Sequence, residues 1–277
     1  MSGPPTYFNP DVKRVLDVEL VRTLDHDSVV CCVRFSPDGK YVATGSNRLA
    51  QIFDAHDGRK VCRFEIQHGD DAPNKAADLY VRALTFSPDG RYLLTGTEDK
   101  LLRIRSSVSP SRQTVSMLLL VAWTTTYVYV WDIHSGALIE ELGGSFGGHG
   151  DAVFSLAFSP DGKNLISGSL DRTVKMWEVS PPQDGESAAL KGGKFVKMFV
   201  GHRDFVLAVA YTPDAEWILS SSKDLCVQFW DPNTGKFQFE LQGHRNSVIS
   251  VAVSPKGGYF VTGSGDMKAR IWSYQSF

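Results

Sequence analysis

The sequence predicts an all-β fold built from copies of one antiparallel unit. Three observations predict it: a turn signal that recurs along the chain, an alternating apolar run before each copy, and a cluster of small residues followed by an aromatic residue after it. Alternating runs punctuated by Pro, Asp and Gly turns are typical of strands in an antiparallel meander. A spacing of about 42 residues between copies is typical of a repeat architecture.

The turn signal is Ser-Pro-Asp-Gly, which occurs three times in full and twice in altered form. The five copies are 36–39, 87–90, 159–162, 212–215 and 254–257. Each follows an alternating run such as 29–35 and precedes a second short strand that ends in Gly, Ser or Thr. A third strand then ends near an aromatic residue, which is Phe53, Trp131, Trp177, Trp230 or Trp272.

A histidine marks the start of four of these units: His26, His149, His202 and His244. The last three begin a longer set of residues with a fixed spacing. In the three sets an Asp follows the His by 22 positions, and a Trp follows the Asp by 6. This register resembles the WD40 repeat, in which His, a Ser or Thr of the second strand, Asp and Trp form a buried hydrogen-bonded tetrad. The resemblance implies three structural tetrads: His149, Ser167, Asp171 and Trp177; His202, Ser220, Asp224 and Trp230; and His244, Thr262, Asp266 and Trp272.

A structural role for these sets is favoured over a catalytic one. Buried polar groups are stable when fully partnered, and such a network fixes one strand against its neighbours. A hydrolase triad would appear once, with an exposed nucleophile and an oxyanion hole. Three copies, each with its own Trp, therefore predict a scaffold without catalytic residues.

No metal or cofactor site is expected either. The cysteines are Cys31, Cys32, Cys62 and Cys226, and none forms a Cys-x-x-Cys pair. Outside the tetrads, no cluster of His, Asp or Glu has the spacing of metal ligands. The cysteines are expected to be reduced thiols, which suits the cytosol or the nucleus.

The WD pattern implies a β-propeller, in which each repeat supplies the outer strand of one blade and the inner three strands of the next. The last repeat ends just after its third strand, so its blade lacks an outer strand. The leftover apolar segment 18–24 is expected to pair with this C-terminal blade and close the ring, which hides sheet edges. Residues 1–14 are then an N-terminal extension, and 15–277 a single propeller domain.

The repeat is interrupted in the middle of the chain. Successive turn signals begin 51, 72, 53 and 42 residues apart, and loops at 66–78 and 180–194 account for the two values near 50. The value of 72 includes the atypical segment 106–126, which has no turn signal, and normal pattern resumes at Tyr127. We therefore expect five blades plus a half-blade at 127–142, with the apolar run 115–123 a candidate outer strand of the second blade. Our hypothesis is that 106–126 is not native repeat sequence and results from an altered splice or reading frame.

Composition excludes two further classes of function. The net charge is −2 and the sequence pI about 6.4, so no basic excess favours direct DNA binding. The most apolar run, 115–123, is far shorter than the ~20 residues of a membrane helix, and residues 1–8 are polar and Pro-rich, unlike a signal peptide. No membrane contact is expected.

The ends of the chain carry a closer resemblance, in segments 7–18, 24–33, 201–207, 243–253 and 263–272. They resemble the C-terminal propeller of the fungal Tup family of transcriptional corepressors, over about residues 7–105 and 127–275. The resemblance implies a seven-bladed nuclear propeller that docks DNA-bound repressors. It also implies a tetratricopeptide-repeat partner of the Cyc8 or Ssn6 type, and repression through histones and the transcription machinery.

Two departures from the family pattern affect these expectations. The chain lacks about one and a half blades in its middle, and it lacks the N-terminal helical region through which the family tetramerises and recruits its partner. We therefore expect this chain to be monomeric and unable to repress alone.

WD propellers bind partners mainly across the narrow face around the central channel. The resemblance places a docking surface on the loops before each first strand and between the second and third strands. The residues there are Asp27, Tyr80, Arg82, Phe154, Leu170, Arg203, Phe205, Leu207, Lys223, Arg245, Ser247 and Ile249. Aromatic and Arg side chains among them are candidate hot spots. Strand alternation also makes Phe154, Phe205 and Leu207 candidates for packing between blades.

Two other interpretations compete with the corepressor. A WD40 adaptor in signalling or in a ubiquitin-ligase complex would also receive short motifs, and an F-box or similar module upstream in the gene would favour it. A propeller enzyme would place unpaired carboxylates or metal ligands in the central channel, and the sequence offers no such cluster.

Overall fold

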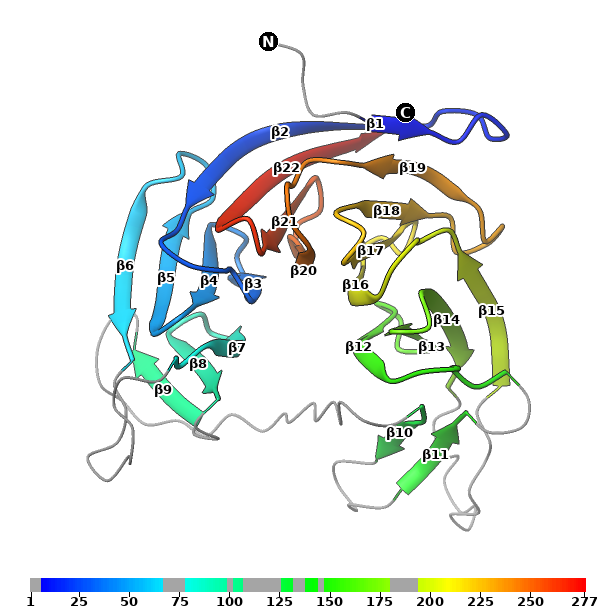
Figure 1. The fold of residues 1–277 in the computed structure, drawn as a ribbon, viewed down its shortest axis with the longest axis horizontal. Coiled ribbons are helices and arrows are strands. Elements are labelled where there is room, and N and C mark those ends of the chain that lie inside the picture. The colour runs from blue at the N-terminus through cyan, green and yellow to red at the C-terminus, as the bar shows by residue number, and fades with distance from the viewer. Residues whose placement is uncertain are drawn as a thin grey trace. The chain divides into compact units, whose positions relative to one another are not determined.

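The computed structural model describes residues 6–66, 78–98, 102–106, 126–131, 138–143, 147–179 and 194–277. In these residues every regular element is a β-strand, and all pairings are antiparallel (Figure 1). The strands fall into two compact units. Unit 1 holds β2 to β9 and β20 to β22, and unit 2 holds β1 and β10 to β19.

The C-terminal blade of unit 1 contains the expected N-terminal outer strand. Its inner strands are β20 (Val248–Val253), β21 (Tyr259–Ser264) and β22 (Lys268–Ser276), and its outermost strand is β2 (Leu16–Asp25). β2 pairs with β22 from Leu16 opposite Ser276 to Asp25 opposite Lys268, with one irregularity between Leu20 and Arg22. The predicted pairing of 18–24 with the C-terminal blade is confirmed.

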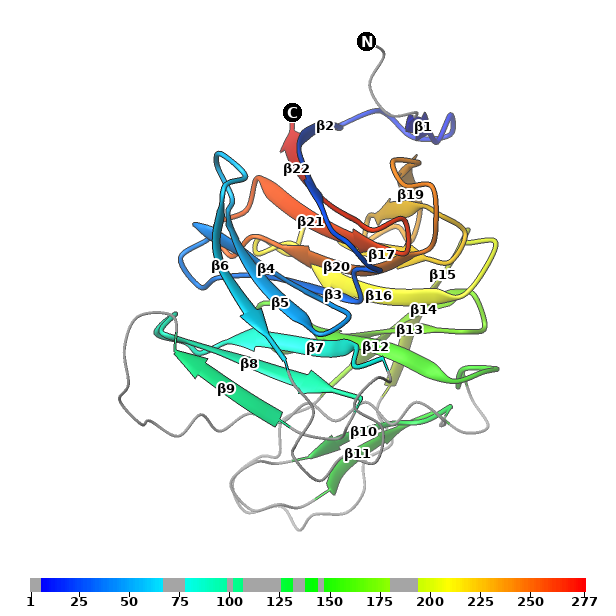
Figure 2. The same cartoon turned by 60° about the vertical axis from the view of Figure 1, so that its left-hand side comes forward.

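Unit 1 contains two more blades, which Figure 2 shows from another side. One is four-stranded, with β3 (Cys32–Phe35), β4 (Tyr41–Ser46), β5 (Leu49–Asp54) and β6 (Lys60–Glu65) in order. The other has β7 (Val81–Phe86), β8 (Tyr92–Thr97) and β9 (Leu102–Ser106). The run 115–123, the candidate fourth strand of this blade, lies outside the described residues, as does most of 106–126.

Unit 2 contains two blades and a two-stranded ribbon. One blade orders β12 (Val153–Phe158), β13 (Asn164–Ser169), β14 (Thr173–Glu178) and β15 (Lys194–Val200). The other orders β16 (Val206–Tyr211), β17 (Ile218–Ser222), β18 (Val227–Trp230) and β19 (Phe237–Leu241), with β1 (Thr6–Phe8) beyond β19. The ribbon pairs β10 (Val128–Trp131) with β11 (Leu138–Leu142). The expected five blades plus a half-blade are confirmed, whereas β1 as a fifth strand is new.

The recurring turn signal has one physical explanation in four of its copies. At the first copy the Ser36 hydroxyl donates to Asp38 at 2.6 Å and accepts from the backbone N–H of Tyr41 at 2.9 Å. Asp38 in turn accepts the backbone N–H of Lys40 at 3.1 Å. The next residue, Gly39, has a φ of 70°, where glycine is favoured. The same bonds recur at the copies that begin at Ser87, Ser159 and Thr212.

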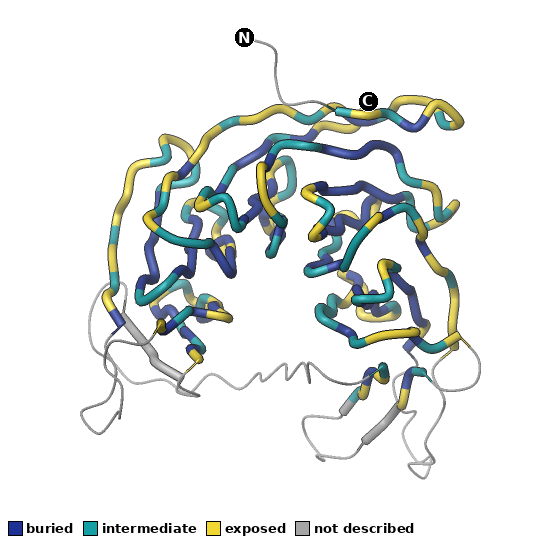
Figure 3. Tube along the Cα trace, viewed as in Figure 1, coloured by how far each residue is buried: buried dark blue, intermediate teal, exposed yellow. Residues whose placement is uncertain are grey.

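The small-residue clusters let neighbouring blades approach closely. A Cβ on Gly263 would lie 2.8 Å from Val30, and one on Gly45 would lie 2.8 Å from Val81. In unit 2, a Cβ on Gly168 would lie 2.8 Å from Val206. Each of these valines lies at or just before the first strand of the next blade, so glycine permits the contact. Most inner strands are largely buried, whereas the outer strands β2, β6 and β15 are mostly exposed (Figure 3). The outer strand β19, which pairs with β1, is mostly buried.

Candidate docking surface

The three His, Ser or Thr, Asp and Trp sets each form a hydrogen-bonded chain. In the blade of β16 to β19, the Trp230 indole N–H donates to the Ser220 hydroxyl at 2.7 Å, and that hydroxyl lies 2.6 Å from His202 Nε2. His202 Nδ1 lies 2.8 Å from Asp224. The other two sets repeat this chain, with every distance between 2.7 and 3.1 Å.

The direction of hydrogen bonding follows from the two ends of each set, because the Trp can only donate and the ionised Asp can only accept. The Ser or Thr hydroxyl therefore accepts from the indole and donates to His Nε2, and His Nδ1–H donates to the carboxylate. Burial alone would raise the pKa of Asp224, but the hydrogen bond and charge interaction with His202 lower that pKa. Burial lowers the pKa of His244, which favours its neutral form. The set in the C-terminal blade therefore favours a neutral His244 beside an ionised Asp266.

Each carboxylate also holds the loop that precedes the first strand. Asp224 accepts the backbone N–H of Arg203 at 2.9 Å, and Asp266 accepts that of Arg245 at 3.0 Å. The equivalent bond from Gly150 to Asp171 is 2.9 Å long. Two of the residues expected to dock a partner, Arg203 and Arg245, thus have their backbone fixed by a buried set.

A second bond ties each of these loops to the end of the second strand. The Ser222 hydroxyl donates to the carbonyl of Asp204 at 3.0 Å, and the Lys223 N–H donates to the carbonyl of Phe205 at 2.9 Å. In the C-terminal blade, the Ser264 hydroxyl donates to the Asn246 carbonyl at 3.1 Å. The loop before the first strand and the loop after the second are therefore bonded to one another within a blade.

A fourth, incomplete set is present at His26. Its Nε2 lies 2.8 Å from the Thr44 hydroxyl, and its ring packs 5.5 Å from Phe53, which takes the place of the Trp. The position 22 residues after His26 is Arg48, with a φ of 58°, and His26 Nδ1 instead contacts the carbonyl of Leu24 at 2.9 Å. The sequence indicated that His26 begins a unit. The rest of this set was not predicted, because a Phe stands where the other sets have a Trp.

All twelve residues expected on the docking surface are at least partly accessible. Asp27, Arg82, Arg203, Lys223 and Arg245 are exposed, and the others are half-buried: Tyr80, Phe154, Leu170, Phe205, Leu207, Ser247 and Ile249. In unit 2 the Lys223 ammonium lies 4.9 Å from the centre of the Phe205 ring. In unit 1 the Arg82 guanidinium lies 5.0 Å from the centre of the Tyr80 ring. Each unit thus presents an aromatic ring beside a cation.

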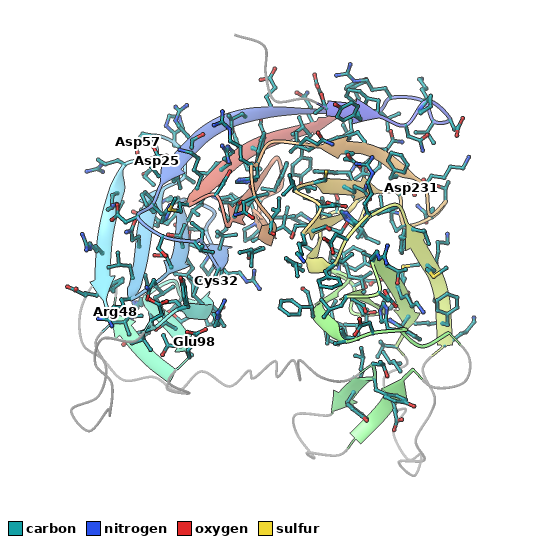
Figure 4. The ribbon with its side chains drawn as sticks, viewed as in Figure 1. Asp25, Cys32, Arg48, Asp57, Glu98 and Asp231 are labelled. Atoms are coloured by element: carbon teal, nitrogen blue, oxygen red, sulfur yellow. The ribbon has the colours of Figure 1, made fainter. Side chains whose placement is uncertain are left out.

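Acidic partners of these cations were not expected from the sequence. Glu98 (Figure 4), just after β8, pairs with Arg82. Asp204 lies 3.9 Å from Lys223. Glu240 on β19 is buried and lies 3.4 Å from Arg203. Asp204 could have been found, because it lies in the same loop as Arg203. Glu240 could not, since its position depends on a bulge in the pairing of β18 with β19.

Metal ligands and membrane spans are both absent from the described part of the chain. Among the described residues, no group of three or more His, Cys, Asp or Glu is arranged to hold a metal ion. No helix there is long and apolar enough to cross a membrane. The four cysteines are free, and burial raises the pKa of the Cys32 thiol well above its usual range.

Blades of repeated antiparallel strands, each fixed by a His, Ser or Thr, Asp and Trp set, define the class of WD-repeat proteins. The chain belongs to this family: it matches the WD domain, G-beta repeat over residues 18–54, 74–106, 140–178, 193–231 and 235–273. The matched repeats leave out residues 107–139, which include most of the atypical segment.

The chain is similar to three known proteins. Two of them are named as regulators of transcription, and the third is protein groucho. The chain is 49% identical to the transcriptional repressor rco-1 of Neurospora crassa, over 82% of this chain and 46% of the relative. It is 33% identical to the general transcriptional corepressor TUP1 of Saccharomyces cerevisiae, over 82% and 47%. Identity to protein groucho of Drosophila melanogaster is 26%, over 78% and 30%. The resemblance to the Tup family is confirmed.

The chain spans about half the length or less of these relatives. The alignment with the Neurospora protein runs over 285 positions but takes up 82% of the 277 residues, so roughly 60 of its positions have no counterpart here. That number corresponds to about one and a half repeats.

Proposed function

We propose that this chain is the non-catalytic docking platform of a transcriptional corepressor. In this proposal, sequence-specific DNA-bound repressors bind the loops that precede the first strands of the blades. The observation that carries it is the bond from Arg203 to Asp224, which fixes the backbone of an exposed loop residue on a buried network. The names of the Neurospora and yeast relatives support the corepressor assignment over a signalling or ubiquitin-ligase adaptor.

The loops suit recognition of a peptide or a small domain. Phe205 is half-buried beneath the Lys223 ammonium, and Tyr80 has the same relation to Arg82. Such aromatic and Arg side chains supply most of the binding free energy at many interfaces. Loops that are already fixed lose little conformational entropy on binding, which favours affinity.

The remaining partners of the proposal follow the Tup-family resemblance. We infer a nuclear location, cooperation with a tetratricopeptide-repeat corepressor of the Cyc8 or Ssn6 type, and contact with histones. Direct binding to DNA is not part of the proposal, because a net charge of −2 offers no general attraction to phosphates.

A chimera tests this function. The chain replaces the WD-repeat region of the yeast corepressor in cells that lack the natural protein, and a reporter under a DNA-bound repressor is measured. We expect repression by the chimera, and at least about a tenfold loss with Phe205→Ala. The matched control is Val61→Ala, which truncates an exposed residue on the outer strand β6. A soluble chimera that fails to repress contradicts the proposal.

A further inference from the structure

Strand β15 is an outer strand with a row of exposed apolar side chains. It is the last strand of its sheet, and in the described part of the chain no strand pairs with its outer edge. Four apolar side chains on it are exposed by 38% to 62%: Phe195, Val196, Met198 and Val200. Figure 3 shows most of the strand in the colour of exposed residues.

The pairing with β14 places three of these side chains on one face. Phe195 lies opposite Trp177, Met198 opposite Lys175 and Val200 opposite Thr173. The Phe195 ring packs on Trp177 with 5.7 Å between centres, which leaves Met198 and Val200 as the most exposed part of the row. Val196 is the extra residue at the irregularity in the pairing, between Phe195 and Met198.

The positions equivalent to Met198 and Val200 carry polar or charged residues in two other blades, whereas the position of Phe195 is taken by the exposed Leu20 in β2. In β6 the residues on the corresponding face are Arg63 and Glu65, and in β2 they are Thr23 and Asp25, all exposed. Charged side chains on outer strands are a common protection against unwanted strand pairing. β15 lacks this protection at the same register.

The neighbouring blade of the same unit shows how such an edge is covered. β1 runs antiparallel to β19, with Phe8 opposite Phe239 and their rings 5.6 Å apart. Asn9 extends the pairing: its backbone N–H donates to the Gln238 carbonyl and its side-chain amide to the Phe237 carbonyl, both at 2.9 Å. An outer strand of this architecture thus accepts a fifth strand that places an apolar side chain over an apolar partner.

We propose that β15 is a docking edge for an extended segment of a partner protein. The segment adds as a fifth strand antiparallel to β15, with aliphatic or aromatic side chains at alternate positions over Phe195, Met198 and Val200. Its backbone hydrogen bonds supply affinity, and the alternate side chains supply specificity. This site is distinct from the loops proposed to bind repressors and does not depend on that function.

A synthetic strand tests the proposal. The probe is a fluorescein-labelled nine-residue peptide in which valine alternates with threonine between terminal lysines, and fluorescence anisotropy measures its binding to the whole chain. We expect saturable binding that Met198→Glu weakens at least about tenfold. The matched control is Val61→Glu on β6, another exposed residue of an outer strand, which should leave binding unchanged.

Two further measurements separate strand addition from apolar adsorption and from self-association. A peptide methylated at alternate backbone nitrogens keeps its side chains but loses the donors that face β15, so it should not bind. Equal binding of the methylated and parent peptides, or of Met198→Glu and the unmodified chain, overturns the proposal. Sedimentation that shows a dimer lost in Met198→Glu also overturns it, because a second copy would then occupy the edge. Circular dichroism of both variants should show unchanged folding, since both side chains are exposed.

Discussion

The Asp224 carboxylate accepts the backbone N–H of Arg203 at 2.9 Å while it also contacts His202 at 2.8 Å. One side chain therefore joins a buried network to an exposed loop. The same arrangement recurs at Asp171 and Asp266. The repeated sets thus hold the loops that would contact a partner, in addition to holding the strands of each blade together.

Asp224→Asn should loosen that loop. The amide keeps one oxygen acceptor but lacks the charge and the second acceptor, so we expect a loss of about 2 kcal/mol in the free energy of unfolding. Amide hydrogen exchange at Arg203 should become faster. Asp231→Asn is the matched control, because Asp231 caps the turn after β18 at the other end of the same blade (Figure 4). An equal increase in exchange at Arg203 in both variants would contradict the argument.

Trp230→Ala should destabilise far more than Phe205→Ala. Trp230 is fully buried, and its indole completes the hydrogen bonds of Ser220. Its truncation should cost roughly 3–5 kcal/mol, the scale of a large core deletion. Phe205 is half-buried in a loop, so its loss should leave the melting temperature nearly unchanged while binding weakens. Thermal unfolding of both variants checks this, and equal destabilisation would remove Phe205 from the docking surface.

The stability of the chain should fall as the pH is lowered below about 6.5. Burial lowers the pKa of His244 in the folded chain, with Arg270 acting in the same direction and Asp266 against it. The unfolded chain therefore takes up a proton first as the pH falls, and the free energy of unfolding decreases. Urea unfolding at pH 8 and pH 5.5 should show a smaller loss for His244→Gln than for the unmodified chain. An equal loss in the free energy of unfolding in both chains would show that the His244 imidazole does not contribute to this pH dependence.

A steeper loss should follow below about pH 4. The pKa values of Asp171, Asp224 and Asp266 are all lowered in the folded chain, mainly by their histidine partners once the opposing effect of burial is overcome. Their contribution is complete above the ordinary carboxyl pKa and is lost as the pH falls toward the folded values. An acid titration followed by tryptophan fluorescence measures it, and a chain that stays equally stable from pH 4 to pH 2.5 would contradict it.

How much of the fold and of the candidate site could be predicted depends on the length of the sequence pattern that indicates each element. The pairing of β2 with β22 was predictable, because the last repeat lacks an outer strand and an apolar segment remained near the N-terminus. β1 was not, since a strand of three residues has no detectable period and depends on Asn9 bonding to β19. The members of the tetrads follow from spacing. The burial of Glu240 against Gln228 and Arg203 does not, because it requires the register of two strands.

Gly168→Val should destabilise the contact between the two blades of unit 2. Even the first added carbon would lie 2.8 Å from Val206 and 2.9 Å from Val209, both side chains of the next blade's first strand. These valines are buried in one cluster with Ile166, Val174 and Trp230, so moving them would disturb the packing of that cluster. Overpacking of this kind typically costs about 1–3 kcal/mol. Gly162→Val is an unsuitable comparison because its φ is 72°, whereas Gly150→Ala meets its nearest atom at 3.8 Å and serves as the control. Thermal unfolding that lowers the melting temperature equally in both variants would show that the close approach of the blades does not require Gly168.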